Sequence, residues 1–563
     1  MRVPTRAGLP VMTDPALNFA AALGESRLSR WRRALPILAS APRETTAILW
    51  ARLAGRRVRA RQALAALIGL DHRRLWCDPG EQARLTASKA DAPHADPSQA
   101  DIRMPDDLGR PGTAPVVILT APGHTLLPGT VAQLCAALAR SPMHQAIYGD
   151  ALLIRRDGTA MPLLRPAFDP DYLMAVDYIG PVIAIRRSGL DAIAAPTGAP
   201  ARAADLILRL AERFGGQAIG HLPRPLSQSH LLPAGDAGEA TVHRTVVRAA
   251  LDRVGATDVE TVMEPDGILT LRHPLPAEWP LVSLIVPTRD RLDLLRPCIA
   301  SLLERTDWPA REILICDNGS REPETLAYFA DLTARGLARI VPCPGPFDFA
   351  GMNNAAARQA RGRVLVFVNN DVEALHPDWL ERLVREALRP EVGAVGAKLI
   401  DGAGRIQHGG VLLGPGGLVT HAHRFFASDA PGYLGVLRAT HAVSAVTAAC
   451  LVVEAAKFAA VGGFDAQAFA VDFNDVDLCL RLNQAGYRTL FVPGAVLNHF
   501  EAASRRWTRD ARERHLREVA AFRTRWGSLL AQDPHYHPGF DPDLGTYARL
   551  RPGWPEAGPV NPR

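Results

Sequence analysis

Several features are scarce in this 563-residue sequence, and each scarcity excludes a class of protein. Lysine occurs only at Lys89, Lys398 and Lys457, so nearly all of the 64 basic residues are arginine, which reflects coding bias before any binding preference. No apolar run approaches the ~18 to 20 residues that a membrane-spanning helix needs. The first residues contain no long apolar core followed by a small-residue cleavage site, so we predict no signal peptide and a cytoplasmic protein.

Cysteine is present, but its pattern excludes a disulfide or zinc framework. The seven cysteines are an odd number and include no CxxC pair, as expected of buried thiols in a reducing compartment: Cys77, Cys135, Cys298, Cys316, Cys343, Cys450 and Cys479. The content of 47% hydrophobic and 22% charged residues is that of a globular protein and excludes a mostly disordered chain or a collagen-like fibre. The diffuse net charge of +6 suits an anionic substrate or a membrane surface and does not require nucleic acid.

The sequence divides into five predicted regions. They are a basic N-terminal helical region (1–77), a linker or loose loop (78–114), an α/β domain that is a degenerate copy of the next one (115–275), a second α/β domain (280–540) and a C-terminal tail (541–563).

The basic region permits two interpretations. Residues 27–62 hold ten arginines against the single acid Glu44, interleaved with leucine and tryptophan. The favoured interpretation is a solvated helical face, or an arm packed on the rest of the chain. The alternative is a helix lying on a membrane surface, with arginines on acidic headgroups, and hence a protein peripheral at the inner face of the plasma membrane.

Beyond residue 280, apolar runs alternate with amphipathic stretches. The runs at 281–287, 312–316 and 364–368 predict buried parallel strands, and the helical stretches between them predict a doubly wound α/β layer. Such a layer binds its ligand beyond the carboxyl ends of the strands. Polar residues follow each run at that point: Thr288, Arg289 and Asp290, then Asp317, Asn318, Gly319 and Ser320, then Asn369, Asn370 and Asp371.

The chain contains an internal repeat. Residues 116–142 align without gaps on the segment that begins at Leu365, and later segments match in the same order. In this alignment Pro122 stands opposite Asp371, and Ala203 stands opposite Asp475. We therefore expect the first copy to retain an α/β core without the carboxylates. Its candidate roles are docking on the second copy, which we favour, and presenting an acceptor.

The segment Asn369, Asn370 and Asp371 offers side-chain oxygens as metal ligands. Oxygen ligands of this kind suit Mg²⁺ or Mn²⁺, with substrate phosphates completing the coordination. Asp475 and Asp477 lie near the start of a predicted helix, where capping is the structural alternative for either of them. His499 follows an apolar strand and becomes a plausible metal ligand because carboxylates already line the same site.

These residues resemble a known family. The motifs, in order, are VSLIVPTRDR, ILICDNGS, VLVFVNNDVEALHPDWL, AVTAACLVV, GGFD, FNDVDLCLRL and HFEAASR, followed by DPHYHPGF at 533–540. Together they resemble family 2 glycosyltransferases of the nucleotide-sugar-dependent GT-A fold, in particular bacterial rhamnosyl- or galactosyl-type transferases of O-antigen and exopolysaccharide assembly. The likeness covers roughly residues 280 to 540 and implies a GT-A fold with a mixed sheet, preceded by a degenerate GT-A-like copy.

The resemblance also implies roles for individual residues. Asp475 matches the catalytic base, and Asp371 with His499 matches the ligands of a divalent metal, Mn²⁺ or Mg²⁺. The resemblance implies that six further residues bind the nucleotide or the sugar donor: Pro287, Thr288, Asp290, Asp317, Asn369 and Asn370. Two positions depart from the family pattern, because Asn369 replaces an aspartate of the DxD motif and Asn474 replaces a glutamate before the base.

The implied activity is inverting transfer of a hexosyl or deoxyhexosyl group from a nucleotide-diphosphate sugar to a saccharide or lipid-linked saccharide acceptor. The alternative is a non-catalytic scaffold or sugar-nucleotide-binding protein. A nicotinamide or flavin oxidoreductase is disfavoured because PTRDRLD occupies the turn where GxGxxG would lie. A nucleotidyltransferase is disfavoured because no glycine-rich basic loop follows the first strand.

Overall fold

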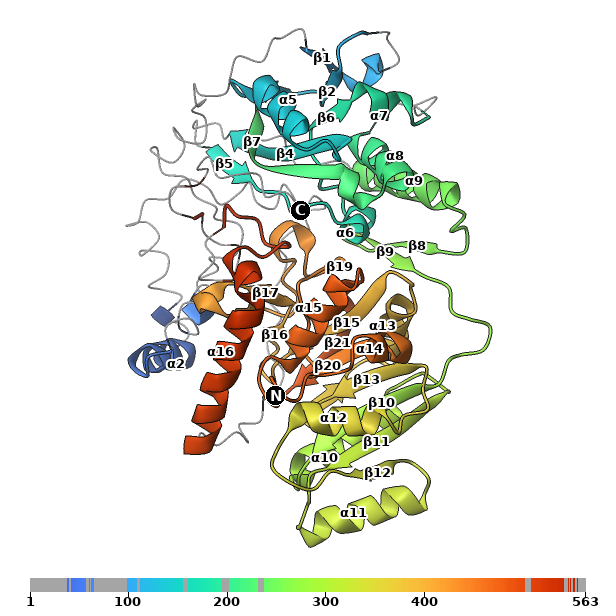
Figure 1. Cartoon of the computed structure of the whole chain (residues 1–563), viewed down its shortest axis with the longest axis vertical. Coiled ribbons are helices and arrows are strands. Elements are labelled where there is room, and N and C mark those ends of the chain that lie inside the picture. Colours follow the sequence, from blue (N-terminus) through green and yellow to red (C-terminus); the bar gives the residue numbers. More distant parts are fainter. Residues whose placement is uncertain are drawn as a thin grey trace.

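A computed structural model describes residues 99–540, except 109–111, 155–159, 195–201, 231–236 and 502–507, together with parts of 38–64 and a few positions beyond 540. Two large sheets lie one above the other (Figure 1). We call residues 99–272 the first domain and residues 280–540 the second domain. None of the helices in the described part of the chain is both long enough and apolar enough to cross a bilayer.

The second domain is built on a mixed ten-stranded sheet. Its strand order is β12 (Arg339–Pro342), β11 (Arg311–Asp317), β10 (Val282–Thr288), β13 (Val364–Val368), β20 (Cys450–Glu454), β15 (Val392–Ile400), β21 (Arg488–His499) and β14 (Val372–Ala374). Strands β16 (Ile406–His408) and β19 (His441–Ala442) pair at its sides. Strands β10 to β13 are parallel neighbours, whereas β20 runs antiparallel to both β13 and β15. The predicted α/β class with a mixed sheet is confirmed.

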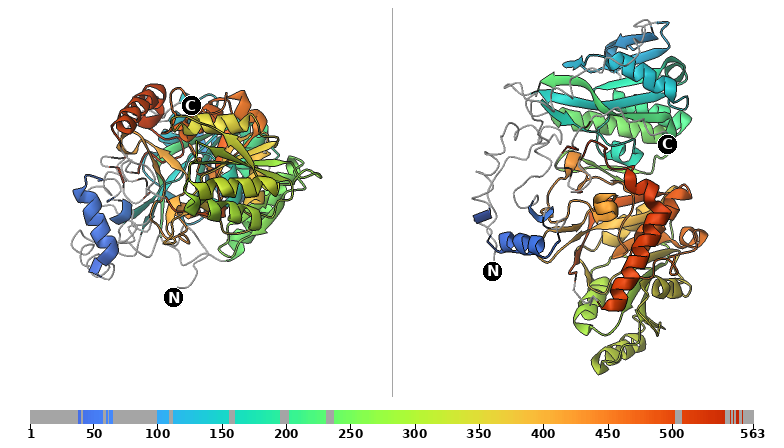
Figure 2. Two further views of the ribbon diagram at one scale, coloured as in Figure 1. Left: turned by 90° about the horizontal axis from the view of Figure 1, so that it is seen from below. Right: turned by 60° about the vertical axis from the view of Figure 1, so that its left-hand side comes forward.

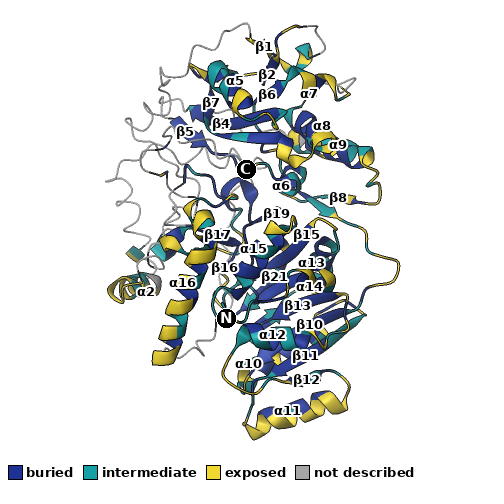
Figure 3. Ribbon diagram, viewed as in Figure 1, coloured by how far each residue is buried: buried dark blue, intermediate teal, exposed yellow. Residues whose placement is uncertain are grey.

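Helices cover both faces of this sheet because its central strands are apolar on both sides. Alternate residues of β10 belong to different cores: Ile285 packs in one, while Leu284 and Val286 pack in the other. Helices α10 (Leu292–Glu304), α11 (Pro323–Ala334) and α13 (Trp379–Ala387) cover the second of these faces. Helices α12 (Phe349–Ala357), α14 (Ala455–Ala460) and α15 (Asn474–Gln484) cover the first. Figure 3 shows the central strands of this sheet as buried.

The first domain has a smaller sheet with related connections. Its order is β1 (Ala100–Arg103), β2 (Val116–Thr120), β6 (Val182–Arg186), β4 (Ala146–Ile154), β7 (Ile219–His230) and β3 (His124–Leu126), with β5 (Ala160–Leu163) beside β4. The order β2-β6-β4-β7-β3 and the sense of every pairing match β13-β20-β15-β21-β14. Among the described strands of the first domain, none corresponds to β11 or β12.

Strand register corrects two expectations. The pair His124 with Ser229 corresponds to Val372 with His499, so Gly123, not Pro122, is the counterpart of Asp371. The ungapped alignment placed the counterpart of Asp371 one residue too early. Its register had been set by matches in the helical part of the segment, whereas the strands are shifted by one residue. The predicted linker 78–114 also contains β1, a four-residue strand with two charged residues that pairs in parallel with β2.

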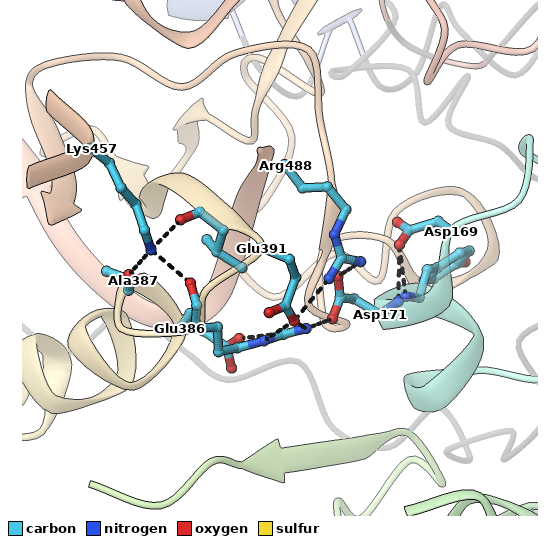
Figure 4. Close-up of polar contacts among 10 residues, drawn as sticks. Asp169, Asp171, Glu386, Ala387, Glu391, Lys457 and Arg488 are labelled. Carbon is cyan, nitrogen blue, oxygen red and sulfur yellow. Dashed lines mark hydrogen bonds and ion pairs between the residues drawn. The ribbon is translucent and has the colours of Figure 1, made fainter. Parts of the chain in front are cut away.

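The two domains meet through helix α6 (Pro170–Ala175) of the first domain (Figure 4). Asp171 forms ion pairs with Arg389, at 2.7 Å, and with Arg488 of the second domain. The carboxylate of Asp169, which caps α6, accepts a hydrogen bond from the Ala442 N–H at 2.6 Å. Burial works to raise the pKa of Asp171, but the two guanidinium groups outweigh it and hold that pKa below its ordinary value.

Hydrogen bonds extend this interface. The Leu164 N–H donates to the Tyr433 hydroxyl at 2.8 Å, and the Tyr172 hydroxyl donates to the Leu434 carbonyl at 2.5 Å. Figure 2 shows the first domain resting on the second in a further view. The structure therefore places the first domain against the second through buried polar contacts, the arrangement expected for docking.

We predict that Asp171→Asn destabilises the protein by roughly 3 kcal/mol, because it removes a buried carboxylate that pairs with both Arg389 and Arg488 across the interface. Urea unfolding measures this effect. Asp331→Asn is the matched control, since the exposed Asp331–Arg335 pair lies on α11 and should contribute less than about 1 kcal/mol. Equal stability of the two variants would contradict a structural role for the interface.

Because the pKa of Asp171 is depressed on folding, the contribution of Asp171 to stability should fade as the pH falls below about 4.

Candidate active site

The carboxyl ends of β10, β11 and β13 meet in one hydrogen-bonded network. The Thr288 hydroxyl accepts a hydrogen bond from the Asn370 amide at 2.9 Å. The Thr288 carbonyl accepts one from the Asn318 N–H, also at 2.9 Å. The structure thus brings together three segments that the sequence predicted to converge. Pro287 and Thr288 form the end of β10 itself.

Asp290 and Asp317 hold the turns at this edge. The Asp317 carboxylate accepts a hydrogen bond from the Ser320 N–H at 2.8 Å. Asp290 accepts hydrogen bonds from the N–H groups of Arg321, at 2.6 Å, and Glu322, at 2.9 Å. Asp290 and Arg291 have φ values of +50° and +55°, a left-handed conformation that costs non-glycine residues energy and persists only where neighbouring contacts impose it. Each of these carboxylates therefore uses at least one oxygen to fix the backbone at the carboxyl ends of β10 and β11.

Asp371 and His499 lie next to each other although they are far apart in the sequence. Val372 of β14 pairs with His499 at the end of β21, and the Phe500 N–H donates to the Asp371 carbonyl at 3.1 Å. This pairing leaves 3.3 Å between the Asp371 Oδ1 and the His499 Nε2. Both side chains are about nine-tenths buried.

The Asp371–His499 pair fits a divalent cation. Carboxylate oxygen and imidazole nitrogen are ligands of Mn²⁺ and related ions. Two adjacent ligands on an octahedral ion, each about 2.1 Å away, stand about 3.0 Å apart. The observed 3.3 Å is close to that separation and longer than the ~2.7 to 2.9 Å of a charge-assisted hydrogen bond.

Asp475 occupies the second position of helix α15 and faces the segment before β20. Its carboxylate accepts hydrogen bonds from the N–H groups of Ala448, at 3.0 Å, and Val476, at 2.8 Å. The same segment reaches Asn369, whose N–H donates to the Ala449 carbonyl at 3.1 Å. Burial raises the pKa of Asp475 above its ordinary value, although these hydrogen bonds oppose the rise. A raised pKa makes the ionised carboxylate a stronger base.

Asp477, the neighbouring candidate, has a structural role. Its side chain is fully buried and accepts hydrogen bonds from Arg481 at 2.7 Å, Arg525 at 2.8 Å and Trp526 at 3.0 Å. Three donors occupy its oxygens, so it is a poor proton acceptor for a substrate. The sequence pattern could not separate the two aspartates, because their difference arises from helix α16 (Arg509–Ala531).

A second cluster was missed by the sequence analysis. Asp150, His221 and His537 approach one another closely enough to hold a metal ion. However, the Gly539 N–H donates to the His537 Nδ1 at 2.9 Å, which leaves the proton on Nε2, where it reaches Asp150 at 2.9 Å. The cluster is therefore a satisfied hydrogen-bonded contact that ties the C-terminal DPHYHPGF segment to the first domain.

Comparison with known proteins identifies the site-bearing region. Residues 283–408 match the family model described as glycosyl transferase family 2. These residues make up the family 2 glycosyltransferase part of the second domain. They include β10, β11, β13 and Asp371 but end before Asp475 and His499.

Two curated relatives extend the likeness beyond this family 2 region. The chain is 34% identical over 435 residues to the uncharacterized protein y4gI of Sinorhizobium fredii, covering 73% of this chain and 47% of that protein. It is 35% identical over 424 residues to the O-antigen biosynthesis protein RfbC of Myxococcus xanthus, covering 74% of this chain and 33% of that protein. The chain thus spans less than half the length of both relatives.

A solved structure with some likeness is the mannosyltransferase PcManGT of Pyrobaculum calidifontis in complex with GDP-Man and Mn²⁺. Its sequence identity is 20% and its TM-score 0.33, over 49% of this chain and 71% of that one.

We predict that Mn²⁺ raises the melting temperature of the wild-type protein and leaves that of Asp371→Ala unchanged. Ligand binding at 100 times Kd stabilises a folded protein by about 2.7 kcal/mol, and the variant lacks one charged ligand. Thermal unfolding with and without Mn²⁺ measures the shift, with Asp331→Ala as the control for losing an aspartate. A full shift retained in Asp371→Ala would place the ion elsewhere.

Proposed function

We propose that the protein is a metal-dependent glycosyltransferase that moves a sugar from a nucleotide-diphosphate sugar to a saccharide acceptor with inversion. The single observation that most supports this is the arrangement of Asp475: a partly buried carboxylate of raised pKa, hydrogen-bonded to the segment that also contacts Asn369, beside the family 2 motif. Cell-surface polysaccharide assembly, as O-antigen or exopolysaccharide, is the proposed setting, and the relative named for O-antigen biosynthesis supports it.

The proposed reaction is a single displacement. Asp475 accepts the proton of an acceptor hydroxyl, and that oxygen attacks the anomeric carbon from the face opposite the diphosphate. Asp371 and His499 would hold the divalent ion, which supplies positive charge to the leaving diphosphate. Thr288, Asn370 and the turns fixed by Asp290 and Asp317 would line the nucleotide. A single displacement needs no second carboxylate as nucleophile.

The first domain is proposed to be non-catalytic. The counterparts of Asp371, His499 and Asp475 are Gly123, Ser229 and Ala203, none of which offers a carboxylate or an imidazole. The Asp205–Arg209 ion pair, which matches Asp477–Arg481, supports the alignment of Ala203. The described part of this domain also lacks counterparts of β11 and β12, the two strands that lie beyond β10 at the edge of the second sheet.

We predict that Asp475→Asn retains donor binding and loses turnover by ~10² to 10⁴-fold, the usual contribution of a general base. A panel of sugar nucleotides with Mn²⁺ or Mg²⁺, assayed for nucleoside diphosphate release in the presence of saccharide acceptors, provides the measurement. Asp331→Asn serves as the control.

Wild-type turnover should decline as the pH falls through the raised pKa of Asp475, because protonation removes the base.

Three results would count against this function. Unchanged turnover in Asp475→Asn would move the base elsewhere. Release of pyrophosphate would indicate a nucleotidyltransferase. Donor binding without any diphosphate release, across the panel, would favour the alternative of a sugar-nucleotide-binding scaffold.

Peripheral membrane association is a further part of the proposal. On helix α2 (Pro42–Leu53), Leu49, Trp50 and Leu53 are 56%, 69% and 86% exposed. They share one face because they lie three and four residues apart. Arg43 and Arg52 are exposed beside them, and Figure 3 shows much of α2 as exposed. Large apolar side chains flanked by arginine suit the interface of an anionic bilayer.

We predict that the protein binds phosphatidylglycerol-containing vesicles and that the double variant Trp50→Glu/Leu53→Glu binds them at least about tenfold more weakly, because two apolar side chains no longer enter the bilayer. Vesicle co-sedimentation measures the affinity, with neutral phosphatidylcholine vesicles for comparison. Leu516→Glu is the matched control, since Leu516 is 65% exposed on α16. Equal binding of the double variant and the control would contradict a role for α2.

A further inference from the structure

Three side chains behind His499 form a continuous chain of hydrogen bonds. The His499 Nδ1 lies 3.2 Å from the Gln407 Oε1, and Gln407, on β16, is 4% exposed. The Gln407 Nε2 donates to the Glu501 Oε1 at 2.9 Å. Arg424 Nη2 donates to both carboxylate oxygens of Glu501 at 2.6 Å. Glu501 lies within the HFEAASR motif, but the sequence analysis assigned no role to any of the three residues.

The Arg424–Glu501 pair determines which way the Gln407 amide points. Contacts of 2.6 Å from a guanidinium to both oxygens are those of an ionised carboxylate, which only accepts hydrogen bonds. Gln407 must therefore present its NH₂ group to Glu501. Its carbonyl oxygen is then directed to His499, which agrees with the observed contact.

The orientation of Gln407 in turn fixes the proton on His499. A carbonyl oxygen accepts, so the Nδ1 of His499 must be the N–H that donates to it. In the neutral ring the Nε2 then bears a lone pair. That lone pair faces the Asp371 Oδ1 at 3.3 Å, so two acceptors oppose each other in a site that is about nine-tenths buried. A cation placed between these two atoms would be bound by both of them.

Backbone conformation supports a constrained role for this chain. Glu501 has φ +44° and Phe425, next to Arg424, has φ +71°, both left-handed for non-glycine residues. Conformations of this kind persist where surrounding contacts impose them and are frequent at functional sites. Arg424 also lies over the Phe425 ring at 5.1 Å, which restricts the guanidinium.

We propose that Gln407, Glu501 and Arg424 are positioning residues that fix His499 in its Nδ1–H tautomer and thereby prepare its Nε2 as a ligand for a divalent cation. This inference rests on the metal dependence proposed above, and it adds residues from the loop after β18 (Val419–His421) and from β16 to the site. None of the three touches the cation. Their effect is transmitted through the imidazole ring, as outer partners of metal-ligating histidines commonly act.

The test measures Mn²⁺ affinity by electron paramagnetic resonance, which needs no substrate and no turnover. Gln407→Leu should weaken Mn²⁺ binding by ~10 to 100-fold, the usual effect of removing such a partner. Gln359→Leu is the control, because Gln359 is an exposed glutamine of the same domain. Equal affinity of the two variants would overturn the proposal.

A double exchange separates tautomer control from general packing. In Gln407→Glu/Glu501→Gln the carboxylate introduced at position 407 would still accept from the His499 Nδ1–H, and the amide introduced at position 501 would bridge it to Arg424. We expect Mn²⁺ affinity within a few-fold of wild type in this variant, and losses in each single exchange. A double variant no better than the single ones would contradict the relay.

The tautomer itself is visible by NMR of ¹⁵N-histidine-labelled protein without metal, with the His499 signal assigned from its loss in His499→Gln. An Nδ1–H ring supports the proposal, and an Nε2–H ring overturns it. Wild-type protein that binds no Mn²⁺ would also overturn it. Normal Mn²⁺ binding without sugar transfer would instead contradict the proposed function alone.

Discussion

The antiparallel pairing of β14 with β21 is the constraint on which the candidate site depends. Strand β14 follows directly from the Asn369–Asp371 segment, and β21 ends at His499, so one short pairing joins two distant parts of the chain at the sheet edge. The pairing is specified by burial: Val372, Ala374 and Leu497 are fully buried and pack in the same core. A one-residue slip would turn these side chains to the opposite face and separate Asp371 from His499.

The comparison of the two sheets shows which part of the architecture is tied to chemistry. Both domains keep the same five-strand order and the same senses of pairing, which are requirements of folding. Each domain adds one parallel strand to this order, β1 or β10. Among the described residues, only the second domain continues the sheet with the parallel strands β11 and β12. Three buried aspartates of the first domain lie at the interface, where Asp169, Asp171 and Asp150 contact the second domain or the C-terminal segment. These contacts attach the α/β core of the first domain to the rest of the chain.

Sequence patterns predicted the elements whose signal is local. The runs that became β10, β11 and β13 are continuous and apolar, and strand geometry then requires the polar residues after them to share an edge. Strand β1 was missed because its sequence, ADIR, has only four residues, two of them charged, and it pairs in the sheet only through β2. The first-domain counterpart of Asp371 was misplaced by one residue because register is a property of pairing and not of sequence spacing.

Residue roles that arise from long-range contacts could not be predicted. Asp475 and Asp477 look equivalent in the sequence, and only the approach of Arg525 and Trp526 from α16 shows that Asp477 is occupied. Gln407, Arg424 and Glu501 belong to three separate segments, and nothing in their spacing indicates one chain of hydrogen bonds. The role of each residue of this kind follows from which donors and acceptors the fold brings together.

The most direct test of the account is a crystal structure with Mn²⁺ and a nucleoside diphosphate, analysed by anomalous scattering from manganese. The account predicts an anomalous peak between the Asp371 carboxylate and the His499 Nε2, about 2 Å from each. It also predicts diphosphate oxygens on the open side of the ion. A peak at Asp150, His221 and His537, or the diphosphate bound with Asp371 and His499 directly hydrogen-bonded to each other, would contradict it.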